Sequence, residues 1–206
     1  MKRNKQQYTF IDLFAGLGGF HLALQQLGCK CVFASEIKDD LRKLYALNFP
    51  DTPIYGDITK INLEDIPAHD IICGGFPCQP FSQAGKRQGF NDEKERGNLF
   101  DYICDIVAFH KPKYIFLENV ANLKGHDHGN TWKVIYGRLH DELNYDVQET
   151  IISPHQFGIP QHRKRIYIVG VRKDLGGLKN FKFPQPTNAQ CDIHDIIDEE
   201  DTKYIP

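Results

Sequence analysis

The chain has 206 residues, of which 41% are hydrophobic and 25% charged, and its formal net charge is −2. These values are typical of one globular domain and exclude an intrinsically disordered chain. No apolar run approaches the roughly 20 residues that cross a membrane, so a membrane protein is not expected. The slightly negative charge argues weakly against a free-standing nucleic-acid-binding protein, although basic residues gather at 86–87 and 162–165.

The spacing of the six cysteines indicates neither a disulfide framework nor a metal site. Cys29 and Cys31 stand too close together for a metal-binding pair, and no Cys-x-x-Cys occurs. The basic stretch at 1–7 leads into a strand-like segment rather than the apolar core of a signal peptide. We therefore expect reduced thiols, no bound metal and a cytoplasmic location.

Strand-like and helix-like segments alternate along the chain. The predicted strands are 8–14, 31–36, 54–57, 70–73, 114–120, 146–152 and 165–172. The predicted helices are 20–27, 39–49, 98–110 and 130–143. No helical pattern separates the last two strands, so we expect that pair to be antiparallel. The alternation predicts an α/β fold with a doubly wound, mostly parallel seven-stranded sheet and an antiparallel last strand. Residues 1–175 form the predicted domain, and 176–206 are expected to be an irregular tail that turns acidic at 192–201.

A glycine-rich turn at 14–19, Phe-Ala-Gly-Leu-Gly-Gly, joins the first predicted strand to the first helix. Its glycines let a ligand approach the backbone, and the helix amino terminus offers unpaired N–H groups. Glu36, at the end of the second strand, can accept hydrogen bonds from both hydroxyls of a ribose, and Asp57 can accept from an adenine amino group. These features predict a nucleoside cofactor. The Gly-x-Gly-Gly spacing and the bulky Phe14 favour S-adenosylmethionine over NAD, which leaves an NAD-linked redox protein as a disfavoured alternative.

The segment 74–82, Gly-Gly-Phe-Pro-Cys-Gln-Pro-Phe-Ser, follows the fourth predicted strand. We expect its two glycines to let the backbone turn and to let another segment pack closely against it. The two prolines stiffen the backbone on both sides of Cys78. Glu118 lies near the end of the fifth strand, and since the carboxyl ends of neighbouring strands meet at one rim, a thiol and a carboxylic acid are expected to face one site. Arg163 and Arg165 can activate the thiol and hold anionic or carbonyl oxygens. Taken singly, a buried cysteine, a capping glutamate and a solvated basic loop are the plainer interpretations.

Four motifs in this order resemble those of the cytosine carbon-5 methyltransferases, especially the bacterial DNA enzymes of restriction–modification systems. They are the turn at 14–19, Pro-Cys-Gln-Pro-Phe-Ser at 77–82, Glu-Asn-Val at 118–120 and Gln-x-Arg-x-Arg at 161–165. The resemblance runs from about Tyr8 to Arg172. It implies the Rossmann-like fold of S-adenosylmethionine-dependent methyltransferases, with double-stranded DNA as the partner.

The resemblance also implies a role for each reacting residue. Cys78 adds to carbon 6 of cytosine, which makes carbon 5 nucleophilic enough to take the methyl group. Glu118 hydrogen-bonds or protonates ring nitrogen 3. Arg163 holds the base oxygen, and Arg165 supports Cys78 or that contact. The base must leave the duplex to reach such a pocket.

Further residues are assigned by the same resemblance. The cofactor pocket would be formed by Phe14, Gly16, Leu17, Gly18, Glu36, Ile37, Asp57, Ile58, Pro77 and Leu99. Ile37 replaces the aromatic residue that stacks on adenine in many relatives, so we expect weaker stacking, with the ring held between Ile58 and Pro77. Segment 79–96 resembles the family's loop that closes over DNA, and the implied DNA contacts are Gln79, Ser82, Lys86 and Arg87.

Nothing after Arg172 matches the family's target-recognition region or its final Gly-Asn motif. We therefore expect a catalytic half, either a truncated form or one subunit whose second chain carries recognition. Residues 1–206 alone are predicted to bind S-adenosylmethionine weakly and to methylate DNA poorly or not at all, which a tritium-transfer assay on unmethylated DNA would test. Two alternatives stay open: a tRNA cytosine-5 methyltransferase that shares these motifs, and a non-catalytic cofactor-binding subunit.

Overall fold

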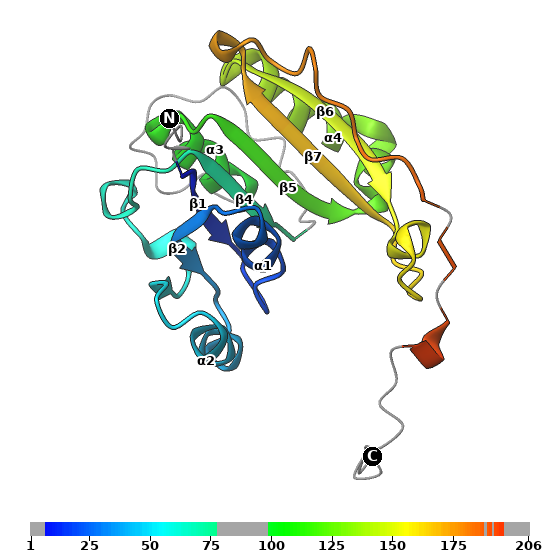
Figure 1. Ribbon diagram of the computed structural model, residues 1–206. Helices are drawn as coiled ribbons and strands as arrows, with labels where there is room; N and C mark the ends of the chain where they lie inside the picture. Colours follow the sequence, from blue (N-terminus) through cyan, green and yellow to red (C-terminus); the bar gives the residue numbers. More distant parts are fainter. Residues whose placement is uncertain (1–6, 78–98, 188, 191, 196–206) are drawn as a thin grey trace, which may run out of the picture.

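The chain forms one mixed sheet covered by helices (Figure 1), and the computed structural model describes residues 7–77, 99–187, 189–190 and 192–195. The strands are β1 (Thr9–Leu13), β2 (Lys30–Ser35), β3 (Ile54–Tyr55), β4 (Ile71–Gly75), β5 (Tyr114–Val120), β6 (Tyr145–Ile152) and β7 (Arg165–Arg172). Their order in the sheet is β3-β2-β1-β4-β5-β7-β6. The strands from β1 to β5 pair in parallel, whereas β7 is antiparallel to both β5 and β6. The predicted seven-stranded α/β fold with an antiparallel last strand is confirmed.

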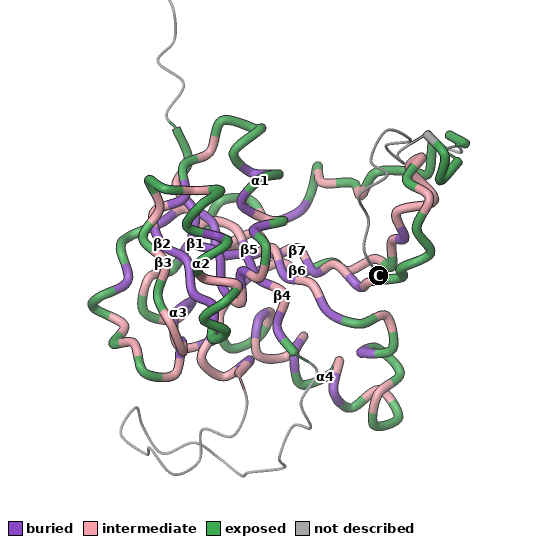
Figure 2. Tube along the Cα trace, turned by 90° about the horizontal axis from the view of Figure 1, so that it is seen from below, coloured by how far each residue is buried: buried purple, intermediate pink, exposed green. Residues whose placement is uncertain are grey.

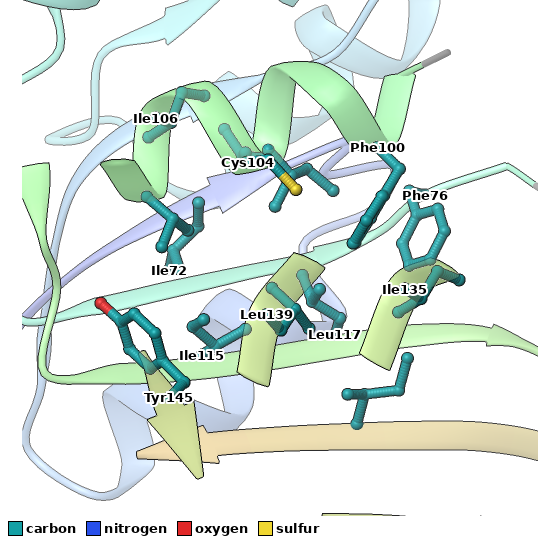
Figure 3. Packing of buried hydrophobic residues seen from close by; sticks show 14 of the residues in the cluster. Ile72, Phe76, Phe100, Cys104, Ile106, Ile115, Leu117, Ile135, Leu139 and Tyr145 are labelled. Atoms are coloured by element: carbon teal, nitrogen blue, oxygen red, sulfur yellow. The ribbon is translucent and has the colours of Figure 1, made fainter. Parts of the chain in front are cut away.

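Helices cover the sheet from both sides. They are α1 (Gly19–Gln26), α2 (Asp39–Asn48), α3 (Leu99–His110) and α4 (Asn130–Gly137). On one face, Figure 3 shows Ile106 of α3 above Ile72 of β4, and Phe100 of α3 beside Phe76. Leu117 of β5 and Ile135 of α4 belong to the same cluster. On the other face, Leu24 of α1 packs with residues of β1, β2 and β4, and Tyr45 of α2 packs in a smaller cluster nearby. Buried residues accordingly concentrate on the central strands (Figure 2).

The predicted helix over 130–143 is interrupted. After α4, residues Arg138–Glu142 form a π-helical turn, in which the Leu143 N–H bonds to the carbonyl of Arg138 at 3.0 Å. Arg138 pairs with Asp101 of α3 at 2.6 Å and with Glu142 at 3.1 Å. Gly137 ends α4 at this point, and the π-helical turn that follows is tied to a distant helix through Arg138.

Strand β4 runs through Gly74 and Gly75, so the chain does not turn at this pair, whereas the close packing expected there is observed. A Cβ built on Gly74 would lie 2.6 Å from the carbonyl oxygen of Leu13, and one on Gly75 would lie 3.0 Å from Glu118 Oε2. The two glycines therefore serve close approach inside the sheet: one lets β1 come near, and the other leaves room for a carboxylate.

The strand order reverses at β1, with β2 and β3 on one side and β4 and β5 on the other. In such sheets, ligands bind at the carboxyl ends of the strands beside this switch point. Leu13 pairs with Gly74, and Gly75 pairs with Glu118, so the ends of β1, β4 and β5 share one rim. Within the described residues, no helix has both the length and the apolar character needed to cross a membrane.

The start of the predicted tail packs on the sheet. Leu178 is buried, and its N–H donates to Asp146 Oδ2 of β6 at 2.9 Å. Beyond it, the described residues are irregular apart from a short 3-10 turn at Ile193–Asp195. The division at 175 stays a prediction.

Candidate functional site

The turn after β1 is held in an unusual backbone conformation. Phe14, Gly16 and Gly18 have positive φ angles of 55°, 54° and 83°. Such angles are rare for a bulky residue like phenylalanine, and they concentrate at functional sites. A Cβ built on Gly18 would lie 2.3 Å from Cε2 of Phe49, so α2 packs directly on the turn. The amino terminus of α1 is thereby presented at the rim in a fixed orientation.

Glu36 ties the ends of three strands together. Its Oε2 accepts a hydrogen bond from the N–H of Gly16 at 2.9 Å, and its Oε1 accepts one from the N–H of Lys38 at 2.9 Å. Its own N–H donates to the carbonyl of Tyr55 in β3 at 3.0 Å. The residue is only 8% exposed. An ionised carboxylate has about four acceptor sites, so both oxygens keep capacity for ligand hydroxyls.

The residues after β3 form another part of the rim. Asp57 Oδ1 accepts hydrogen bonds from the N–H and Oγ1 of Thr59, at 3.0 and 2.8 Å, and so caps a short 3-10 turn. Ile58 is 5% exposed and belongs to the main core, so little of its side chain faces outward. Ile37 and Leu17, by contrast, are 67% and 62% exposed. Pro77 is also exposed, and Leu99 is half-buried against the main core. Their predicted cofactor contacts stay predictions.

The nucleoside methyl donor predicted from the sequence fits this rim. Among the described residues, a Cβ built on Gly16 would meet no atom within 4 Å, so these residues leave the space in front of the turn open. Glu36 is fixed beside that space with spare acceptor capacity for a diol. Backbone N–H groups at the start of α1 can hold an anionic end of the ligand.

Glu118 lies in an electrostatically mixed environment at the end of β5. Its Oε1 is 2.8 Å from Nε of Arg165, and the two side chains are 23% and 20% exposed. Burial raises the pKa of Glu118 above its ordinary value, while the charges of Arg165 and then Arg163 oppose that rise. The structure therefore brings these three predicted residues to one place, and Glu118 keeps its proton to a higher pH than a solvated glutamate.

The segment before Arg165 is anchored by a buried serine. Ser153 is 2% exposed and forms a capping box with Gln156 at the end of β6. Its Oγ accepts a hydrogen bond from the N–H of Arg163 at 3.1 Å. This contact orders the backbone that carries Arg163, whose side chain is exposed.

Cys78 and the predicted DNA contacts Gln79, Ser82, Lys86 and Arg87 lie outside the described residues. The residues just before Cys78 are held in place by hydrogen bonds from β5.

The carbonyl of Phe76 accepts a hydrogen bond from Nδ2 of Asn119 at 2.9 Å, and Oδ1 of Asn119 accepts one from the N–H of Val120 at 2.7 Å. Asn119 is 2% exposed. Asn119 therefore holds the chain before Pro77 against β5, the strand that carries Glu118. Sequence reasoning missed this role, although a polar residue inside an apolar strand was a signal for it.

Asp12 is a second residue that sequence reasoning missed. It lies in β1 behind the glycine turn and is 1% exposed. Burial raises its pKa to about 8, while hydrogen bonds from the backbone of His21 and the side chain of Cys73 oppose the shift. An acidic residue inside the apolar run 8–14 was the signal, since buried carboxyls with perturbed pKa values gather at functional sites.

Replacing Asp12 by asparagine is expected to flatten the pH dependence of stability. The pKa of Asp12 in the folded state, about 8, exceeds the unfolded value of about 3.9. Its favourable contribution is therefore complete below pH ~4 and is lost as the pH rises toward 8. Between pH 5 and 8, the free energy of unfolding of the wild type should fall by about 3 kcal/mol more than that of Asp12→Asn, measured by urea denaturation. The exposed Asp40→Asn variant should retain the wild-type slope, and equal slopes for Asp12→Asn and the wild type would contradict the assignment.

Comparison with known proteins identifies the source of this arrangement. The sequence matches the family described as C-5 cytosine-specific DNA methylase over residues 8–205. It is 48% identical to the Type II methyltransferase M.HpaII of Haemophilus parainfluenzae, covering 97% of this chain and 56% of the relative. It is 46% identical to the Type II methyltransferase M.HhaI of Haemophilus parahaemolyticus, covering 91% of this chain and 56% of the relative. The chain thus spans little more than half the length of the curated relatives it matches.

Solved structures agree with the sequence matches. A DNMT2 variant from Spodoptera frugiperda aligns with a TM-score of 0.65 at 27% identity, covering 91% of this chain and 55% of the other. The fold, the order of the motifs and the family match point the same way, and the resemblance predicted from the sequence is confirmed. The chain belongs to the C-5 cytosine-specific DNA methylase family.

Proposed function

We propose that this chain is the catalytic core of a DNA (cytosine-5) methyltransferase that uses S-adenosylmethionine. The observation that carries the proposal is one rim that joins the Glu118–Arg165 pair, the anchored entry to Pro77 and the Glu36–Gly16 turn. S-adenosylmethionine, when bound, supplies an electrophilic methyl group. The curated relatives at 46–48% identity are named Type II methyltransferases, which favours DNA over tRNA as the substrate.

The residues of this chain divide the chemistry between them. The thiolate of Cys78 adds to carbon 6 of a flipped cytosine, and the new bond shifts electron density to carbon 5. Glu118 donates a proton or a hydrogen bond to ring nitrogen 3, which its raised pKa favours. Arg165 orients Glu118 through their 2.8 Å contact, and Arg163 holds the base oxygen. Carbon 5 then takes the methyl group and gives up its proton to solvent water. The bond to Cys78 breaks, which restores the thiolate, and ring nitrogen 3 returns its proton to Glu118.

Binding of the nucleoside end is assigned to Glu36, through the ribose hydroxyls, and to Asp57, through the adenine amino group. Ile37, Ile58 and Pro77 flank the ring. The other proposed cofactor contacts are Phe14, Gly16, Leu17, Gly18 and Leu99. Sequence recognition comes, in this proposal, from a region or second chain equivalent to the part of the relatives that this chain does not match, and the setting is the bacterial cytoplasm.

Replacing Glu36 by glutamine is expected to weaken S-adenosylhomocysteine binding 10- to 100-fold. The amide would remove the charge that strengthens each accepted hydrogen bond and would turn an N–H₂ group toward the N–H of Gly16 or Lys38. Isothermal titration calorimetry on the 206-residue chain gives the dissociation constant. Glu149→Gln is the control, because Glu149 lies on the edge strand β6, at the other end of the sheet from β2, and pairs there with Lys124. Equal affinity in the two variants would refute the role of Glu36.

Ligand and substrate class are tested separately. S-adenosylhomocysteine should raise the melting temperature of the chain and NADH should not, and the reverse result would indicate a redox protein. Tritium transfer from labelled S-adenosylmethionine should then favour duplex DNA over tRNA when the chain is fused to the carboxyl-terminal remainder of M.HpaII. Preferential labelling of tRNA would replace the proposed substrate, and no labelling of either by a fusion that binds the cofactor would favour a non-catalytic subunit.

A further inference from the structure

Arg42 of α2 binds the loop that carries Glu36 and Ile37 and lies beside Gly56 at the end of β3. Its Nη1 donates hydrogen bonds to the carbonyl oxygens of Glu36 and Ile37, each at 2.8 Å. Its Nη2 pairs with Asp39 Oδ1 at 3.0 Å. The same Nη1 lies 3.7 Å from a Cβ built on Gly56, so the guanidinium occupies the space beside the end of β3. The side chain is 26% exposed, which places it mainly within the protein.

These contacts determine the orientation of the Glu36 carboxylate. The carbonyl of Ile37 and the N–H of Lys38 belong to one planar peptide unit. Arg42 binds the carbonyl end of that unit, and the N–H end donates to Glu36 Oε1 at 2.9 Å. Rotation of the peptide unit would break both bonds at once. The guanidinium thus fixes the donor that, together with the N–H of Gly16, aims the carboxylate.

We propose that Arg42 is a positioning residue for the nucleoside end of the methyl-donor site. It acts through the backbone of residues 36–38 rather than by touching the ligand. The identity of the ligand rests on the function proposed above, whereas the backbone contacts do not. The arginine guanidinium binds two carbonyls and a carboxylate at once because its N–H groups are arranged as a rigid fork. Lysine cannot replace it, because its ammonium group is a compact point charge on a shorter side chain.

The test compares Arg42→Gln and Arg42→Lys with Lys43→Gln in the 206-residue chain. Lys43 is the matched control, since it is 76% exposed and pairs with the same Asp39 at 2.7 Å. Arg42→Gln should raise the dissociation constant of S-adenosylhomocysteine about tenfold, Arg42→Lys should give a smaller rise, and Lys43→Gln should stay within twofold. In the ligand-free protein, the amides of Gly16 and Lys38 should exchange hydrogen about tenfold faster in Arg42→Gln than in the control.

A double-mutant cycle separates positioning from a general loss of stability. If Arg42 acts through Glu36, adding Arg42→Gln to Glu36→Gln should weaken binding less than threefold further. An undiminished tenfold loss in that background would overturn the proposal, as would unchanged amide exchange and affinity in Arg42→Gln. Failure of the wild-type chain to bind S-adenosylhomocysteine would instead count against the proposed function, and the exchange measurement would still decide whether Arg42 fixes the turn.

Discussion

Replacing Glu118 by glutamine is expected to lower kcat for DNA methylation about 100- to 1,000-fold, the usual contribution of a general acid or base. Glutamine keeps the size and the contact with Arg165 but cannot deliver a proton. Burial raises the pKa of Glu118 despite the charges of Arg165 and Arg163, so the wild type holds that proton to a higher pH than an ordinary glutamate. Deprotonation should therefore make kcat of the wild type fall as pH rises, and this limb should vanish in Glu118→Gln.

The rate is measured with the fusion to the carboxyl-terminal remainder of M.HpaII, so that recognition does not limit it. Glu149→Gln is a matched control, because Glu149 is 20% exposed and also pairs with a basic residue, Lys124, at 2.6 Å. It should keep kcat within twofold, and both variants should keep the wild-type affinity for S-adenosylhomocysteine. If Glu118→Gln retained more than a third of the activity with an unchanged pH profile, proton delivery by Glu118 would be excluded.

Replacing Gly74 by alanine should lower the free energy of unfolding by about 2–3 kcal/mol, the upper part of the range for overpacking. The added Cβ would lie 2.6 Å from the carbonyl oxygen of Leu13, a backbone atom in the neighbouring strand that cannot rotate away. Since β1 and β4 border the switch point of the sheet, their separation would also spread the turn at Phe14 away from the entry to Pro77. A fall in Tm of roughly 8 °C is expected for a domain of this size.

Gly19→Ala is the control for this substitution. In the part of the chain that the structure describes, a Cβ at Gly19 meets nothing within 4 Å, and the residue begins α1. Alanine there should leave Tm unchanged or raise it slightly. Equal melting temperatures for the two variants would show that the sheet can adjust around Gly74 and that close approach is not its role.

Periodicity and turn chemistry were enough to predict the sheet. Alternating strand and helix patterns identified all seven strands, and the missing helix between 152 and 165 indicated the antiparallel pair. The sequence also predicted that Glu36 and Glu118 lie at the rim, because each glutamate comes near the end of an apolar run that forms a strand. These predictions depend on local sequence, where the signal is strong.

The remaining features depend on contacts between distant segments. Close packing was expected at Gly74 and Gly75, but a glycine pair does not reveal that its neighbours are Leu13 and Glu118. Asn119 and Arg42 bind carbonyl groups of other elements, and a carbonyl leaves no trace in the residue that bears it. Phe14 adopts a positive φ in a turn whose glycines appeared to supply all the necessary freedom.

The most direct measurement of the central claim is covalent trapping of the M.HpaII fusion protein on a duplex oligonucleotide that carries 5-fluorocytosine opposite a mismatched base, with S-adenosylmethionine present. The mismatch lowers the free-energy cost of flipping the base. Fluorine replaces the carbon-5 hydrogen and cannot be removed as that proton is, so the bond between the Cys78 sulfur and carbon 6 persists. We predict a denaturation-resistant protein–DNA adduct that peptide mapping places at Cys78, absent from Cys78→Ser and formed more slowly by Glu118→Gln. An adduct at another residue, or none from protein that binds both the oligonucleotide and S-adenosylhomocysteine, would contradict the assignment.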